Sequence, residues 1–176
     1  MAVNASSSCS FTSTWSMGCK SVAGIIEVYV GAFSATTTSW TYGANGIVSA
    51  QTNAPVFYTL EQGLEFADIH FEGGHSVENG TNFWNQTANL KFNPYDGTNR
   101  NMLTALANPR LTLIAYTQSG KYILLGETNG LDVTASSGGF AKELGGMNGS
   151  LVTLSGKEPS APREMTSALF ATLTIN

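Results

Sequence analysis

Charged residues are scarce in this chain of 176 residues. Asp, Glu, Lys and Arg make up 11% of it, against roughly 25% in an ordinary soluble domain. Charge is depleted at the cores of protein interfaces, so the composition favours a subunit covered by neighbours over the alternative, a secreted β protein. With 8 Lys and Arg against 12 Asp and Glu, a cationic surface that grips nucleic acid through its phosphates is disfavoured.

Long apolar runs are missing and cysteine is rare. No stretch approaches the roughly 18 apolar residues of a membrane helix, and MAVNASSSCSFTSTW has neither the basic nor the apolar region of a signal peptide. We therefore expect synthesis in the cytoplasm and no membrane association. Cys9 and Cys19 are the only cysteines, and two free thiols are favoured over a disulfide between them.

The sequence does contain a succession of short apolar runs separated by turn residues. Residues 111–133, LTLIAYTQSGKYILLGETNGLDV, alternate in the manner of two strands joined by a tight turn, and they predict a central hairpin. Leu113, Ala115, Ile123 and Leu125 are its expected core residues. Gly126 and Gly130 are placed where a bend or turn needs a positive φ.

The remaining runs predict further strands and one helix. Residues 25–33 predict a strand with Ile26, Val28 and Val30 on one face. Residues 64–92 predict a long hairpin, with a bend near residues 67–68, a loop at 72–80 and its longest strand at 81–92. A helix is expected at 98–107, capped by Asp96 or Thr98. Residues 136–139 predict a glycine-rich loop, and residues 150–154 and 168–175 predict strands.

These elements indicate a mainly β (α+β) fold in one domain, 18–176, after a flexible arm at 1–17. Strand runs with turn signals every 8–12 residues, together with a single helix, favour two packed antiparallel sheets in a sandwich or barrel.

The search for chemistry gives only weak candidates. His70, Glu72 and His75 could hold a metal, but a polar surface segment is favoured because no further His or Cys lies nearby. The carboxylates are scattered, so a small hydrolase has no specific support, and nucleotide-binding and nucleophile motifs are absent. Trp15, Trp40 and Trp84 could line a sugar-binding face, although core positions are favoured for them.

Four segments in order carry a resemblance: GCKSVAGIIEVYV (18–30), SVENGTNFWNQTANLKF (76–92), GKYILLGETNGL (120–131) and NGSLVTLSGKEPSAP (148–162). Together they resemble virion structural proteins of the tail-tube class, in particular those of phages that infect Bacteroidetes. The resemblance covers most of residues 18–162 and implies a protomer of two sheets and a helix. It further implies sixfold rings, stacked around a channel for DNA. The family carries no catalytic residues, so it implies no enzyme activity and no cofactor.

The expected function is therefore structural: rings of the tail tube, neck or tail hub in the virion. The expected partners are other copies of the chain, six to a ring as the resemblance implies, and other tail or neck proteins, while DNA passes without specific binding. The long hairpin is the expected ring-closing or ring-stacking element. The oligomer interface is expected at Glu72, Gly73, Gly74, His75, Glu78 and Asn79. Two alternatives stay open, a carbohydrate-binding β-sandwich of a receptor-binding virion protein and, for residues 72–80, a mobile surface turn.

Overall fold

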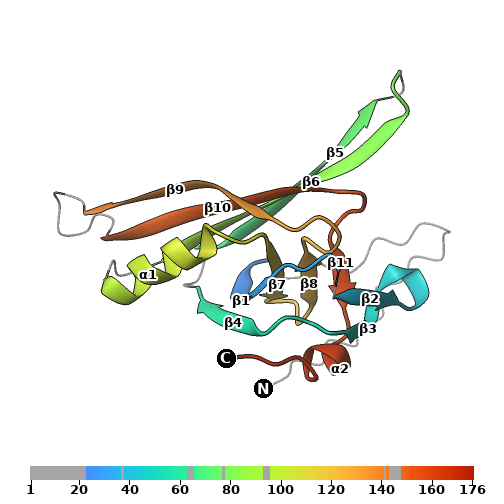
Figure 1. Cartoon of the computed structure of the whole chain (residues 1–176), viewed down its shortest axis with the longest axis horizontal. Coiled ribbons are helices and arrows are strands. Elements are labelled where there is room, and N and C mark those ends of the chain that lie inside the picture. The colour runs from blue at the N-terminus through green and yellow to red at the C-terminus, as the bar shows by residue number, and fades with distance from the viewer. Residues whose placement is uncertain are drawn as a thin grey trace.

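The structure, a computed structural model, describes residues 23–36, 38–62, 66–76, 78–92, 96–140, 142 and 148–176. The arm expected at 1–17, both cysteines and Trp15 lie outside these residues. The described chain forms two stacked β-sheets, called sheets A and B here, with a helix beside them (Figure 1). The expectation of a mainly β fold with two packed sheets is confirmed.

Sheet A has seven strands and sheet B has four. In spatial order sheet A contains β2 (Ser39–Tyr42), β3 (Val48–Thr52), β11 (Arg163–Met165), β8 (Tyr122–Leu125), β7 (Leu111–Thr117), β1 (Ile25–Ala32) and β4 (Phe57–Glu61). Sheet B contains β5 (Asp68–Ser76), β6 (Thr81–Phe92), β10 (Asn148–Glu158) and β9 (Asp132–Phe140). The pairing is antiparallel except between β11 and β3, which meet in parallel at Met165 and Val48.

The central hairpin is confirmed as β7 and β8. Leu113 pairs with Leu125 and Ala115 with Ile123. Leu113, Ala115 and Leu125 are fully buried between the sheets, with Ile123 packed against them. The opposite face of sheet A is also buried, because Ile114 and Leu124 belong to a second apolar cluster. A sheet covered on both faces explains why β7 begins with five buried residues in a row.

Three helical segments accompany the sheets. The helix α1 (Gly97–Leu106) begins at Asp96, whose Oδ1 accepts a hydrogen bond of 2.8 Å from the N–H of Asn99. This confirms the expected cap, and Leu106 joins the core between the sheets. The short α2 (Ser167–Phe170) and the 3₁₀ turn η1 (Ala44–Gly46) complete the set.

The prediction of a strand at 168–175 was wrong. Leu169 of α2 and Leu173 cover the outer face of sheet A instead. Thr166 caps α2 by accepting a hydrogen bond from the N–H of Leu169, so the chain coils where apolar alternation suggested a strand. Only Ile175 bridges to a strand, pairing in parallel with Phe57 of β4.

Two other expectations about strands need correction. A register shift in β1 between Ile25 and Glu27 turns Ile25 into the core and leaves Ile26 exposed, so Ile26 does not share a face with Val28 and Val30. The loop expected at 136–139 is part of β9, in which Gly138 pairs with Ser150 and Gly139 with Gly149.

Gly130 offers a test of the turn that leads from sheet A to sheet B. Its φ is 79°, and a Cβ there would lie 2.8 Å from Cγ of Phe33. Gly120 also has φ 79° but has nothing within 4 Å. Gly130→Val should lower the free energy of unfolding by about 3–5 kcal/mol through strain and crowding together, and Gly120→Val by about 1–2 kcal/mol through strain alone. Urea denaturation measures both, and equal losses would contradict the assigned crowding.

Candidate assembly surface

Both edges of sheet B are open within the described part of the chain. The edge strands β5 and β9 are nine residues long, and each pairs on one side only, β5 with β6 and β9 with β10. Unpaired N–H and C=O groups along an edge strand are a template for pairing with another chain. The edges of sheet B are therefore candidate contacts between copies.

The directions of these two strands allow copies to join head to tail. Every neighbouring pair in sheet B is antiparallel, so β5 and β9, three steps apart, also run in opposite directions. A second copy related by rotation can place its β5 beside β9 and continue an uninterrupted antiparallel sheet. A repeated contact of this kind makes a ring when the rotation closes.

The β9 edge carries few of the devices that usually protect an edge strand. After Asp132, the sequence VTASSGGF has no charged residue and no proline. Lys, inward-pointing charge and Pro are the common blocks to unwanted strand pairing. Because they are missing over these eight residues, β9 is suited to accept a further strand.

The face of sheet B that turns away from sheet A is polar and mostly uncharged. Ala88, Leu90 and Leu154 point into the core and are fully buried, so their neighbours along each strand point outward. The outward residues of the two central strands are Phe83, Asn85, Thr87, Asn89 and Lys91 on β6 and Leu151, Thr153, Ser155 and Lys157 on β10. Their hydroxyl and amide groups bond across the strands, with Thr153 Oγ1 donating to Asn89 Oδ1 at 2.8 Å.

The hairpin of β5 and β6 extends beyond the rest of the sheet (Figure 1). Pairing between β6 and β10 stops at Trp84 and Glu158, whereas β5 and β6 continue to pair as far as Ser76 and Thr81. Residues 73–76 and 78–83 thus form an overhang whose backbone, among the described residues, pairs only between β5 and β6. At its base, Nζ of Lys157 in β10 lies 5.1 Å from the centroid of the Phe83 ring. The expected longest strand at 81–92 is confirmed as β6.

The expected loop at 72–80 is largely strand, which corrects the placement of the candidate interface residues. Glu72, Gly73, Gly74 and His75 belong to β5, while Glu78 and Asn79 lie in the turn at 78–80. Close packing explains the two glycines in a strand, since a Cβ on Gly74 would clash with the ring of Phe83 and a Cβ on Gly73 would lie 2.6 Å from Nε2 of His75. Glu72 and Gly73 lie at the base of the overhang, opposite Asn85 and Trp84, and the other four residues lie farther along it. Their role as an interface stays a prediction.

The structure also places the other candidate residues. His70 Nε2 lies 2.9 Å from Glu72 Oε1, but His75 points to the opposite face, and the described residues contain no group of three potential metal ligands. Trp40 is buried in the second core cluster. Trp84 packs beside Phe71 and His75, with ring centroids 6.0 and 5.9 Å away.

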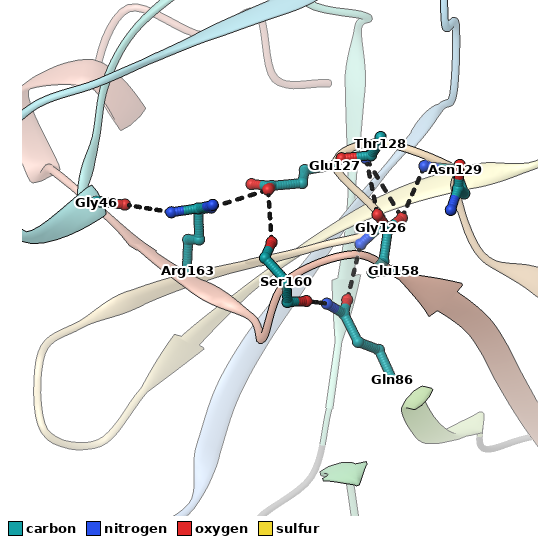
Figure 2. A network of polar contacts seen from close by, with 9 residues as sticks. All are labelled: Gly46, Gln86, Gly126, Glu127, Thr128, Asn129, Glu158, Ser160 and Arg163. Carbon is teal, nitrogen blue, oxygen red and sulfur yellow. Dashed lines mark hydrogen bonds and ion pairs between the residues drawn. The ribbon is translucent and has the colours of Figure 1, made fainter. Parts of the chain in front are cut away.

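A buried polar network lies at the base of the overhang, and Figure 2 shows its members. Its centre is Glu158, only 1% exposed. The carboxyl oxygens accept hydrogen bonds from three successive backbone N–H groups, those of Thr128, Asn129 and Gly130, at 2.9–3.3 Å. Burial raises the pKa of Glu158 and the nearby Glu127 adds to this, while the three N–H donors act against it.

The rest of the network ties the sheets together. Gln86 of β6 accepts from the N–H of Gly126 at 3.1 Å and donates to the carbonyl of Ser160 at 3.0 Å (Figure 2). Glu127 Oε1 accepts from Arg163 Nε and from Ser160 Oγ, both at 2.9 Å. Residues of sheet B therefore hold both the turn that follows β8 and the segment that precedes β11.

Sequence reasoning missed this network, because it saw Glu127 and Glu158 only as two of many scattered carboxylates. One signal was present: the turn GETNG offers several N–H groups in succession, and such groups need acceptors when they are buried. The sequence alone does not indicate which acidic residue supplies the acceptor.

Comparisons with known proteins identify no relative of the chain. No family model, no curated protein and no solved structure matches the chain. Among the described residues there is no helix with the length and apolar character to span a membrane.

The raised pKa of Glu158 predicts a pH dependence of stability. The folded chain keeps this proton to a higher pH than the unfolded chain, so the free energy of unfolding should fall as pH rises from about 4.5, the ordinary value, to the raised one. Glu158→Gln, which cannot ionise, should remove that fall. Urea titrations across this pH range measure it, with Glu61→Gln as the control for loss of one carboxylate from an exposed position. An unchanged pH profile in Glu158→Gln would contradict the assignment.

Proposed function

We propose that this protein is a ring-forming structural subunit of a phage tail. The observation that carries the proposal is the pair of open edges of sheet B, equal in length and opposite in direction. Copies join β5 to β9 and so turn the four-stranded sheets into one closed barrel, which removes the exposed edges. The sequence resemblance to the tail-tube class supports the same assembly and suggests six copies in a ring.

The polar face of sheet B lines the channel in this assembly. Its centre offers hydroxyl and amide groups from Thr87, Asn89, Thr153 and Ser155, with Lys91 and Lys157 toward its ends. Without a concentration of positive charge such a wall has little attraction for phosphates. DNA therefore passes through the channel without specific binding.

The overhang provides the contact along the tube axis. It reaches past the end of sheet B (Figure 1), and within the described chain its distal part contacts only itself, so its tip is available to the next ring or to another tail or neck protein. Glu72, Gly73, Gly74, His75, Glu78 and Asn79 form this contact in the virion. At the base of the overhang, Gln86 of β6 is held by hydrogen bonds to Gly126 and Ser160, which supports an extended hairpin over the alternative of a mobile turn.

Electron microscopy of the purified protein tests the proposal. We expect negative-stain images to show rings or tubes with a central hole. A monodisperse monomer at every protein concentration up to the solubility limit would contradict it.

Shortening the overhang should separate folding from stacking. Replacing residues 74–83 by Asn-Gly keeps the ladder from Asp68 to Gly73 and supplies a two-residue hairpin turn. This variant should melt cooperatively within a few degrees of the parent and form single rings but no tubes, because the described residues among those removed belong to neither apolar core cluster. Tubes of normal length would rule out the overhang as the stacking element.

The channel wall predicts how DNA binding responds to added charge. The parent assembly should bind a short DNA duplex weakly at low salt and not at physiological ionic strength. Asn89→Lys with Thr153→Lys, a cross-strand pair on the polar face, should create binding that weakens steeply with salt. Thr41→Lys with Ala50→Lys, an exposed cross-strand pair of sheet A, adds the same charge elsewhere and is the control. Equal DNA binding by the two double variants would contradict the assignment of the channel wall.

A further inference from the structure

A groove runs beside the open β9 edge, on the face of sheet B that looks toward α1. It has a volume of about 430 Å³ and is lined by Leu103 of α1, by residues 136–140 of β9 and by Ser150 of β10. Phe140, 71% exposed, stands at one end. The groove is open along the side where a further strand would lie.

Small residues make this groove. Ser136 and Gly138 pair with Val152 and Ser150, whose side chains are buried, so both belong to the core-facing side of the sheet. A Cβ on Gly138 would lie 3.2 Å from the carbonyl oxygen of Gly149 and 3.3 Å from Cβ of Ser150. At Gly138, which lines the groove, the backbone of β9 therefore lies close to the neighbouring strand β10. Ser150 Oγ, which also lines the groove, is buried and has no hydrogen-bond partner among the described residues.

A half-exposed aromatic side chain, Phe71, lies on the opposite edge of the same sheet. Phe71 of β5 pairs with Gln86, which is 1% exposed, so Phe71 also belongs to the core-facing side. Phe71 is nevertheless 50% exposed. A large apolar side chain that points to the core side of a sheet yet lies in solvent at its edge is suited to cover by a neighbour.

The antiparallel geometry brings these two features together. When β5 of one copy continues the sheet beside β9 of the next, residues of the same face stand opposite one another. Phe71 then enters the groove above Ser136 and Gly138, where no large side chain of β9 competes for the space. We propose that Phe71 of each copy packs into this groove of a second copy of the chain and fixes the register of the ring. This inference rests on the edge pairing of the proposed function and names the contact that directs it.

Three variants and one control test the contact through the protein concentration at half assembly, measured by sedimentation or light scattering. Phe71→Ala removes the aromatic side chain and Ser136→Phe fills the groove, and each should raise this concentration at least tenfold, as expected for a buried aromatic anchor. The double variant Phe71→Ala/Ser136→Phe should recover part of the loss, since the new ring replaces the missing one. Tyr58→Ala removes an exposed aromatic of sheet A and should change the value less than twofold.

Cysteine cross-linking gives a second readout that does not depend on affinity. With Cys9 and Cys19 replaced by Ser, Phe71→Cys/Ser136→Cys should form a ladder of disulfide-linked copies on oxidation, because a disulfide requires Cα atoms within about 7 Å. Phe71→Cys/Tyr58→Cys should not form it.

The outcomes separate this inference from the proposed function. If the parent forms rings and both Phe71→Ala and Ser136→Phe assemble like it, the groove contact is wrong and the ring proposal stands. If the parent never assembles, both fail. If Phe71→Ala loses its cooperative melt, Ser136→Phe and the cross-linking experiment decide. The contact is overturned if Ser136→Phe assembles like the parent and the Phe71→Cys/Ser136→Cys variant gives no disulfide-linked ladder.

Discussion

The carboxyl group of Glu158 accepts hydrogen bonds from three consecutive backbone N–H groups inside the protein. These groups belong to the turn by which the chain leaves sheet A after β8 and enters sheet B as β9. Glu158 is the last residue of β10, the strand with which β9 pairs. Its side chain therefore fixes where β9 begins relative to β10. Removing the carboxyl group would leave the buried N–H of Gly130 and the partly buried N–H groups of Thr128 and Asn129 to find new partners. A buried donor that finds none costs about 1–3 kcal/mol.

The two sheets differ in how much of their surface is buried. Sheet A is apolar on both faces and is covered by sheet B on one side and by α2 with the last residues on the other. Its edge at β4 is partly closed by backbone hydrogen bonds between Phe57 or Thr59 and residues 174–176. Within the described chain, sheet B has a polar outer face and two unpaired edges, whereas sheet A has one further unpaired edge, at the short strand β2. Hydrogen bonds of Gln86 and Glu158 join sheet B to the turn after β8 and to Ser160.

The sequence predicted correctly those elements that depend on interactions between residues close together in the chain. The central hairpin, the strand at 81–92 and the Asp96 cap were recovered because alternation, a tight turn and a capping side chain act within a few residues. The errors occur where distant partners override local preference. Residues 136–139 read as a loop because Ser and Gly favour turns, yet pairing with β10 makes them strand. Residues 168–175 read as a strand, yet packing on sheet A coils part of them.

The candidate surface was harder to predict than the fold. The sequence located the long hairpin, but it could not show that β5 and β9 are the two edges of one sheet, since strand order depends on the whole topology. Glu158 stayed hidden for the same reason, because its three donors lie some thirty residues away in the chain.

The serines and glycines of β9 also bear on what happens before assembly. Residues 136–139, SSGG, have low intrinsic strand propensity and offer little side-chain contact to an arriving strand. A chance apolar segment gains backbone hydrogen bonds there but almost no packing, so it dissociates readily. If copies join at this edge as proposed, the same small residues would favour a strand whose side chains fill the space they leave over a chance apolar segment, and so would oppose amyloid-like growth.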